Sequence, residues 1–246
     1  SISSVVKAYF HLENLGIIEA RPQSGYYVRH RTAQIVEETE PSFPTAVPTL
    51  VSVSELVMMV MRDAGNPDLI PLGLAAPNPD NLPADRLNRI LSNIGRRNKN
   101  QAVSYEFPPG CERLRVQLAQ RALTTGCSLT PDQFVVTSGC LEAVMLSLRA
   151  VCNPGDTVAI ESPIFYSLLQ LIEVLDLKAL EIPTHPGNGM SISALRYALE
   201  HNPVHACLVI PNFNNPLGSC MPDRKKEELV EILAEREIPL IENDVY

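Results

Sequence analysis

The stretch GDTVAIESPIFY at residues 155–166 contains a short apolar run, TVAIE at 157–161, that reads as a buried strand. Similar runs follow at 133–137, 178–182, 206–210 and 238–242, which read QFVVT, KALEI, ACLVI and IPLIE. Amphipathic helical stretches accompany these runs at 140–151, 164–175, 192–201 and 223–236. Continuous apolar strands that alternate with helices predict an α/β fold, with a mainly parallel sheet covered on both faces.

Upstream of this region the periodicity changes several times. Apolar residues predict helices over 84–97 and 110–125, and Ser52 with Glu55 predicts a capping box for a helix over 53–64. Residues 32–50 hold three prolines and no sustained period, which is typical of a linker. Before it, the pattern predicts a helix over 4–15 and a β-hairpin around a turn at 22–25.

Composition limits the kind of protein. Hydrophobic residues make up 45% of the chain, and no apolar stretch is long enough to span a bilayer. The six cysteines stand singly without a CxxC pair, so we expect reduced thiols in the cytoplasm and no metal site. Residues 1–31 carry four basic and two acidic side chains, a net +2, within a total of −8. A small basic head on an acidic body is compatible with DNA contact at one end only.

Chemistry-bearing residues follow four of the predicted strands. Ligands of open α/β sheets bind beyond the carboxyl ends of the strands, so these segments should share one crevice. They are Ser138-Gly139-Cys140, Ser162 to Tyr166, PNFNNPLG at 211–218, and Asn243 to Tyr246. Two of them have a plain structural alternative: the first can be a tight turn, and Phe165 can be an ordinary core residue. Their convergence is what favours a binding site.

The strings TSGCLEA (137–143), GDTVAIESPIFY, PNFNNPLG and IENDVY (241–246) resemble the cofactor motifs of fold-type I pyridoxal-phosphate aminotransferases. The variant with TSGC and IExDVY is most similar to the aminotransferase-like domain of MocR-type regulators. YEFPPGCERLR at 105–115 resembles the segment that precedes these motifs. The resemblance spans about residues 70–246 and implies pyridoxal 5′-phosphate as cofactor.

The resemblance also implies roles for single residues. Backbone groups of Ser138, Gly139 and Cys140 would hold the phosphate of the cofactor. Phe165 would stack on the pyridine ring, while Asn215 and Tyr246 would bind the phenolic oxygen of that ring. Tyr105 would reach a phosphate, in this family usually that of the dimer partner.

Two departures from the family pattern concern catalysis. Asn243 stands where the family has the aspartate that keeps the pyridine nitrogen protonated, and an amide carries no negative charge. Asp244 is adjacent, but neighbouring side chains of an extended segment face opposite ways. The Schiff-base lysine lies downstream of the matching motifs, and we expect Lys178, Lys225 and Lys226 to be surface residues. The chain by itself is therefore not expected to catalyse transamination.

The first 28 residues resemble the end of a GntR-type winged helix-turn-helix. Side chains matching its DNA-facing positions lie on the helix and on the hairpin wing; they are Ser3, Ser4, Lys7, Arg21, Gln23, Ser24 and Gly25. Such groups mostly contact phosphates, and base contacts come from the start of the helix. The alternative is a helix and hairpin that merely dock on the large domain.

These features divide the chain into the C-terminal part of a winged helix-turn-helix (1–31), a linker with a short helix (32–66) and the N-terminal half of an aminotransferase-like domain (67–246). We expect a piece of a regulator, truncated at both ends and inactive alone. The intact protein would be a cytoplasmic homodimer that binds double-stranded DNA, pyridoxal phosphate and an amino-acid effector. The alternatives are a class I/II aminotransferase with an incidental extension, and a non-functional gene fragment.

Overall fold

The computed structural model of the chain forms two compact units, Ser1–Thr39 and Glu40–Tyr246. The structure describes residues 2–15, 17–22, 24–28, 40–64, 66, 68–70, 77–98 and 103–246.

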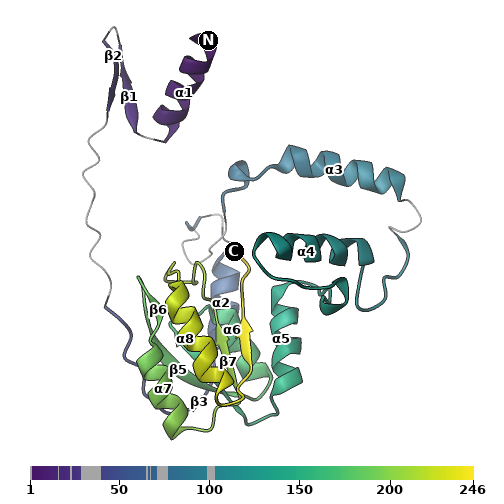
Figure 1. Cartoon of the computed structure of the whole chain (residues 1–246), viewed down its shortest axis with the longest axis vertical. Helices are drawn as coiled ribbons and strands as arrows, with labels where there is room; N and C mark the ends of the chain where they lie inside the picture. The colour runs from purple at the N-terminus through teal and green to yellow at the C-terminus, as the bar shows by residue number, and fades with distance from the viewer. Residues whose placement is uncertain are drawn as a thin grey trace. The chain divides into compact units, whose positions relative to one another are not determined.

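The first unit is a helix packed on a hairpin (Figure 1). Helix α1 (Ile2–Asn14) precedes strands β1 (Ile18–Arg21) and β2 (Gly25–Val28), which pair antiparallel. The rings of Tyr9 on α1 and Tyr26 on β2 stack with centroids 4.6 Å apart. The predicted helix and hairpin are thus confirmed. Few side chains are buried here, because two thin elements enclose little volume; Ile18 is one of them.

The second unit is built on one sheet with the order β3-β5-β4-β7-β8. Four of its strands run parallel to one another: β4 (Thr157–Ser162), β5 (Lys178–His185), β7 (Ala206–Val209) and β8 (Leu240–Glu242). Two short strands pair antiparallel with β5: β3 (Thr49–Leu50) and β6 (Gly189–Met190). All six residues of β4 are buried, as its apolar run predicts.

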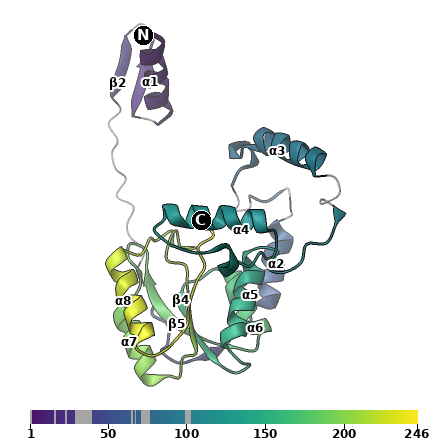
Figure 2. The same ribbon diagram turned by 45° about the vertical axis from the view of Figure 1, so that its right-hand side comes forward.

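Helices cover both faces of this sheet (Figures 1 and 2). Helices α5 (Cys140–Val151) and α6 (Tyr166–Val174) pack on one face, and α7 (Ile192–His201) and α8 (Asp223–Ala234) on the other. Alternate side chains of β4 supply the two cores: Val158 and Ile160 face α5 and α6, and Ala159 faces α7 and α8. The predicted α/β fold with two covered faces is confirmed.

Three further helices precede α5: α2 (Ser54–Ala64), α3 (Ala84–Arg97) and α4 (Glu112–Thr124). Short 3₁₀ turns lie at η1 (Pro79–Asn81) and η3 (Pro131–Gln133). Helix α3 matches its predicted bounds, yet none of its residues is buried. Its strong apolar periodicity therefore leaves Leu87, Ile90, Leu91 and Ile94 exposed.

The strand predicted over 133–137 is wrong. The segment begins in η3, and residues 134–137 are outside any helix or strand. A strand needs the backbone of a neighbouring strand, whereas here the N–H of Val136 donates to the carbonyl of Pro109 in a turn, at 2.9 Å. Gly110 permits this approach: it has φ +98°, and a Cβ on it would lie 2.6 Å from that of Val136.

The predicted linker contains more structure than its composition indicates. Residues 32–39 lie outside the described residues, but 40–50 belong to the second unit, and Thr49–Leu50 form β3 there. The helix predicted over 53–64 is confirmed as α2, although its cap differs. The N–H groups of Val53 and Ser54 donate to the carboxylate of Glu173 on α6, at 2.8 and 2.9 Å, where a Ser52–Glu55 box was expected.

Candidate functional site

The carboxyl ends of β4, β7 and β8 lie side by side, because these strands are parallel neighbours in the sheet. The segments that follow them, together with the start of α5, meet at this edge. Side-chain hydrogen bonds join them in three places: Cys140 to Asn243, Asn215 to Tyr246, and Asn212 to Asp244. These bonds join three of the four motifs predicted to converge; the fourth, Ser162 to Tyr166, lies at the same edge because it follows β4.

The turn before α5 has the geometry of an anion cradle. Gly139 precedes the helix with φ +105°, and no atom lies within 4 Å of the position a Cβ would occupy. The main-chain bond from Ala143 N to Gly139 O, at 3.3 Å, starts the helix, so the amides of Gly139 and Cys140 precede the helical ladder. Free amides at the positive end of a helix dipole attract a phosphate.

One donor expected for that phosphate is occupied. The N–H of Ser138 donates to the carboxylate of Glu142, which lies in the first turn of α5. Glu142 thereby satisfies a main-chain donor outside the helix, as the acidic member of a capping box does. An anion at this turn would have to displace the Glu142 carboxylate to reach the Ser138 amide, whereas Gly139 and Cys140 need no such change.

Cys140 also contacts Asn243, the residue that stands where the family has an aspartate. Its thiol donates to Oδ1 of Asn243 at 3.0 Å. Burial raises the pKa of the Cys140 thiol, so the proton needed for this bond is retained at neutral pH. Asn243 is itself buried, and its N–H donates to the carbonyl of Val209 at 2.9 Å. Within the described part of the chain, nothing accepts a hydrogen bond from its Nδ2.

Asp244 faces elsewhere, as alternation along the chain predicts. Its carboxylate accepts from Nδ2 of Asn212 at 3.0 Å, and the amide oxygen of Asn212 accepts from Lys226 Nζ at 2.9 Å. Asp244 is exposed, whereas Asn243 is buried. The neighbouring carboxylate therefore does not substitute for the missing one in this structure.

The residues expected around the cofactor ring lie at the same edge. Nδ2 of Asn215 donates to the hydroxyl of Tyr246 at 3.3 Å, so the two side chains proposed to share the phenolic oxygen are adjacent. Phe165 immediately precedes α6, and its ring lies 4.5 Å from that of Tyr166 between centroids. Phe165 is half-buried against the α5–α6 core, so one part of its ring packs and another remains accessible.

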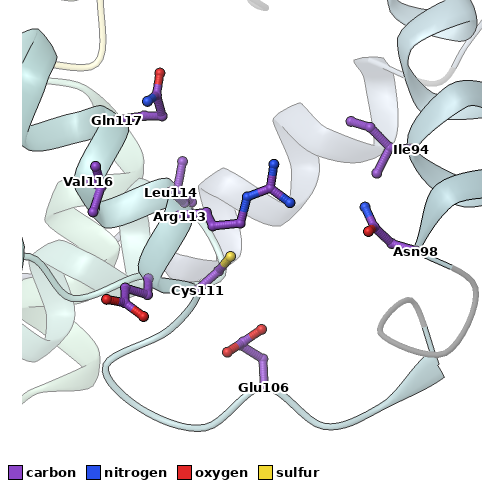
Figure 3. Close-up of a pocket in the computed structure, with 9 residues that line it drawn as sticks. Ile94, Asn98, Glu106, Cys111, Arg113, Leu114, Val116 and Gln117 are labelled. Carbon is purple, nitrogen blue, oxygen red and sulfur yellow. The ribbon is translucent and has the colours of Figure 1, made fainter.

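No contact among the described residues brings Tyr105 to this edge, and its side chain is 92% exposed. The segment that carries it instead borders a cavity of about 680 Å³ between α3 and α4. Figure 3 shows Glu106 and Cys111 on one side of this space, with Ile94 and Asn98 of α3 across it. None of the strand-end residues lines the cavity, so it is separate from the candidate cofactor site.

The predicted DNA-facing residues lie in the first unit. Arg21 is engaged there: it bridges to Glu19 at 2.7 Å, and its guanidinium lies 4.6 Å from the centre of the Tyr27 ring. Ser24 is 2.6 Å from the Tyr27 hydroxyl, and Gly25 has φ +96°. Ser3, Ser4 and Lys7 are exposed on α1, and Gln23 lies outside the described residues.

Glu161 was missed from sequence. It is fully buried at the end of β4, where one carboxylate oxygen accepts from Ile210 N at 2.7 Å and from Asn214 Nδ2 at 2.9 Å. Burial raises its pKa to about 7, against the lowering effect of these two bonds. A charged residue inside a strand predicted to be buried on both faces was the available signal.

The family model for aminotransferase class I and II matches residues 71–246. The chain belongs to this family. Relatives that match its whole length are described as uncharacterized HTH-type transcriptional regulators, YdcR at 38% identity and YjiR at 36%, both from Escherichia coli (strain K12). The chain covers 52% of each, so it spans about half the length of these relatives. These matches bear out the resemblance to MocR-type regulators.

Solved structures agree with the aminotransferase fold. A kynurenine aminotransferase from Pyrococcus horikoshii matches 77% of this chain, and 47% of its own, with a TM-score of 0.67 and 28% identity. An archaeal alanine:glyoxylate aminotransferase has a TM-score of 0.69 over 81% of this chain and 49% of its own, at 24% identity. Among the described residues, no helix is long and apolar enough to cross a membrane, and no cluster of side chains is arranged for a metal ion.

Proposed function

We propose that the full-length protein is a cytoplasmic DNA-binding transcription regulator whose aminotransferase-like domain binds pyridoxal phosphate as effector or sensor. The observation that carries this proposal is the meeting of the α5 N-terminus, Asn243 and the Asn215–Tyr246 pair at one sheet edge. It occurs in a chain that matches, over the whole of its own length, relatives described as HTH-type regulators.

The residues at this edge fit the cofactor. The amides of Gly139 and Cys140 would hold the phosphate, with the open space at Gly139 admitting it. Phe165 would contact the ring, and Asn215 with Tyr246 would bind its phenolic oxygen. When bound, pyridoxal phosphate supplies a ring that withdraws electrons from an amino-acid amine joined to it.

Asn243 favours sensing over catalysis. Its Oδ1 is held by the Cys140 thiol, which leaves the Nδ2 hydrogens to face a ligand. Such hydrogens donate to the lone pair of an unprotonated pyridine nitrogen, whereas a carboxylate would stabilise the protonated one. An unprotonated ring withdraws electrons less strongly, so this chain would bind the cofactor and supply less of the activation that amino transfer requires.

The contacts of residues 40–54, at the start of the second unit, support coupling between the cofactor and the DNA-binding head. The Ser42 hydroxyl donates to the carbonyl of Ser162, three residues before Phe165. Farther along, Asn202 donates to the carbonyl of Ala46 at 3.3 Å, β3 pairs with β5, and Glu173 caps α2. A cofactor-dependent shift of the Phe165 turn would therefore reach residues continuous with the DNA-binding unit.

We further propose that the regulator is a homodimer with an amino-acid effector. The exposed apolar face of α3 and the 92% exposed side chain of Tyr105 support an association of two copies, since large apolar groups are rarely left in water together. In that assembly Tyr105 would reach the phosphate bound by the partner copy.

The test uses the full-length protein and the DNA upstream of its own gene. We expect a mobility shift that changes with pyridoxal phosphate, and that weakens as salt rises because phosphate contacts release counterions. An aminotransferase would instead give no shift at low salt and measurable amino transfer. Absence of both DNA binding and cofactor binding would contradict the regulator and favour the gene-fragment alternative, which stop codons flanking the coding sequence would establish.

A further inference from the structure

Glu161 lies where the sheet meets the candidate cofactor site. Its side chain is fully buried, and one carboxylate oxygen, Oε2, receives both of its hydrogen bonds. The other oxygen, Oε1, is buried and has no hydrogen-bond partner among the described residues. Burying a carboxyl group in this way opposes folding, so an ordinary core side chain would serve the sheet better. The position of Glu161 therefore calls for another explanation.

The partner of Glu161 is the organising residue of the loop at 211–218. The side-chain oxygen of Asn214 accepts from Leu217 N at 3.2 Å, while its Nδ2 donates to Glu161 at 2.9 Å. Its main-chain N–H donates to Ser219 O at 2.9 Å, and its carbonyl accepts from Gly218 N at 2.5 Å. Asn214 is thus buried and bonded in four directions, and it leaves the next residue, Asn215, to face Tyr246.

We propose that Glu161 is a positioning residue for the cofactor: by holding Asn214 it sets the orientation of Asn215 toward the ring oxygen. This inference rests on the proposed binding of pyridoxal phosphate. Glu161 does not touch the ligand, and its effect passes from β4 through the Asn214 amide to the neighbouring Asn215. The bond from Ile210 N, at the base of the loop, fixes the same carboxylate from the β7 side.

The geometry separates three substitutions. Glu161→Gln keeps an oxygen at the same distance from the backbone, and one amide oxygen can accept two hydrogen bonds. Glu161→Asp shortens the side chain by one methylene, so its carboxylate cannot reach Ile210 N and Asn214 together without movement of the loop. Glu181→Asp is the matched control, because Glu181 on the adjacent strand β5 bonds the Ser162 hydroxyl at 3.2 Å and not the loop.

The experiment titrates full-length protein with pyridoxal phosphate and follows the absorbance of the bound cofactor. We expect Glu161→Asp to raise the dissociation constant by about tenfold, the range of one lost hydrogen bond. Its bound-cofactor absorbance should also change its pH dependence, since the ring oxygen loses an oriented donor. Glu161→Gln and Glu181→Asp should stay near the wild-type affinity.

A second background tests the route through Asn215. In Asn215→Ala protein, Glu161→Asp should add little further loss, because the side chain that it positions is gone. An equal loss in both backgrounds, or wild-type affinity for Glu161→Asp, would overturn the inference while leaving cofactor binding intact. Failure of the wild-type protein to bind pyridoxal phosphate would instead overturn the proposed function, and this inference with it.

Thermal unfolding of the cofactor-free variants separates positioning from stability. Equal unfolding temperatures with unequal affinities support a positioning role. If Glu161→Asp does not fold, Asn214→Asp replaces it, since this change keeps the oxygen that accepts from Leu217 and removes the donor to Glu161. A wild-type affinity in a folded Asn214→Asp protein would contradict the inference.

Discussion

The thiol of Cys140 donates to the side-chain oxygen of Asn243 over 3.0 Å, and this bond links the start of α5 to the end of β8. It connects the place expected for the cofactor phosphate with the place expected for the ring nitrogen. Because the bond uses the Asn243 oxygen, it also decides which end of the amide remains for a ligand. The protonation of a bound ring would follow from this orientation.

Asn243→Asp in the full-length protein should strengthen binding of pyridoxal phosphate. A carboxylate opposite the ring nitrogen stabilises its protonated form, and a gain of about tenfold corresponds to roughly 1.4 kcal/mol. Fluorescence or absorbance titration measures the change. Asp244→Asn is the control, since Asp244 bonds Asn212 and should leave affinity unchanged. Unchanged or weaker binding by Asn243→Asp would place the ring nitrogen elsewhere.

Cys140→Ser should preserve the orientation of Asn243, because a hydroxyl donates a hydrogen bond as the thiol does. Cys140→Ala removes the donor and frees the amide to rotate, so its cofactor affinity should fall severalfold relative to Cys140→Ser, a loss of roughly 1 kcal/mol. The same titration compares the two variants. Equal affinities would show that the amide is held by something other than this thiol.

Glu161 should make the folded state less stable as pH rises. Burial raises its folded pKa from 4.5 to about 7, so between these values the folded chain keeps a proton that the unfolded chain releases. Stability is therefore greatest below the unfolded pKa and falls through this window, by on the order of 3 kcal/mol at most. Cys207, its titratable neighbour on β7, stays neutral there, because burial, and secondarily Glu161, raises its pKa to about 12.

Urea unfolding at pH 5 and pH 7.5 measures this effect, with Glu161→Gln as the comparison, since other groups also titrate. The wild-type protein should lose more stability than Glu161→Gln between the two pH values. Parallel losses in both proteins would mean that Glu161 is ionised throughout.

Glu173→Ala should release the start of α2 and the segment before it. The N–H groups of Val53 and Ser54 lose their common acceptor, so limited proteolysis should cut residues 40–64 faster. The hydrogen bond from Val53 N makes the largest contribution to lowering the Glu173 pKa, and the bonds from Ser54 lower it further. A lowered folded pKa gives stability that is present above the unfolded pKa and is lost as pH falls through the folded pKa. Protection should therefore weaken in acid in the wild-type protein.

The control for this experiment is Glu227→Ala, which removes an exposed carboxylate on α8. Its cleavage rate should match that of the wild-type protein. Unchanged cleavage in Glu173→Ala would mean that the pairing of β3 with β5 is sufficient to hold the segment.

Leu91→Lys should weaken the proposed dimer. Leu91 lies on the apolar face of α3 with 66% of its surface exposed, and burying a leucine in an interface contributes about 1.5–3 kcal/mol. Analytical ultracentrifugation of the full-length protein should show a dimer dissociation constant that is raised at least about tenfold. Ser92→Lys adds the same charge to the opposite face of the helix and should not change the equilibrium. Equal dimer dissociation constants for Leu91→Lys and Ser92→Lys would place the interface away from α3.

Local sequence patterns were sufficient to predict much of this fold. The bounds of α3, α5 and α7 follow from helical periodicity, and the apolar run at 157–161 predicts the buried centre of the sheet. The grouping of Cys140, Asn215, Asn243 and Tyr246 follows because parallel neighbours end at a common edge. These features depend on residues close in sequence or on a general rule of topology.

Two of the errors concern partners distant in sequence, and a third concerns a side chain close by. Residues 133–137 have the composition of a strand, but a strand also requires a neighbour, and Val136 bonds to a turn instead. The cap of α2 comes from Glu173, more than a hundred residues away, so no local motif predicts it. Glu142 occupies the Ser138 amide because a side chain one turn away competes with any ligand, which motif resemblance does not reveal.

The two residues of β3 protect a vulnerable edge. Thr49 and Leu50 pair with Ala179 and Lys178, which otherwise would present unpaired main-chain groups at the border of the sheet. Unprotected edges invite pairing with another chain and aggregation. The segment that leads from the first unit into the second is thus also a guard against misassembly: detaching it would cost solubility, so any signal along it should travel with this strand in place.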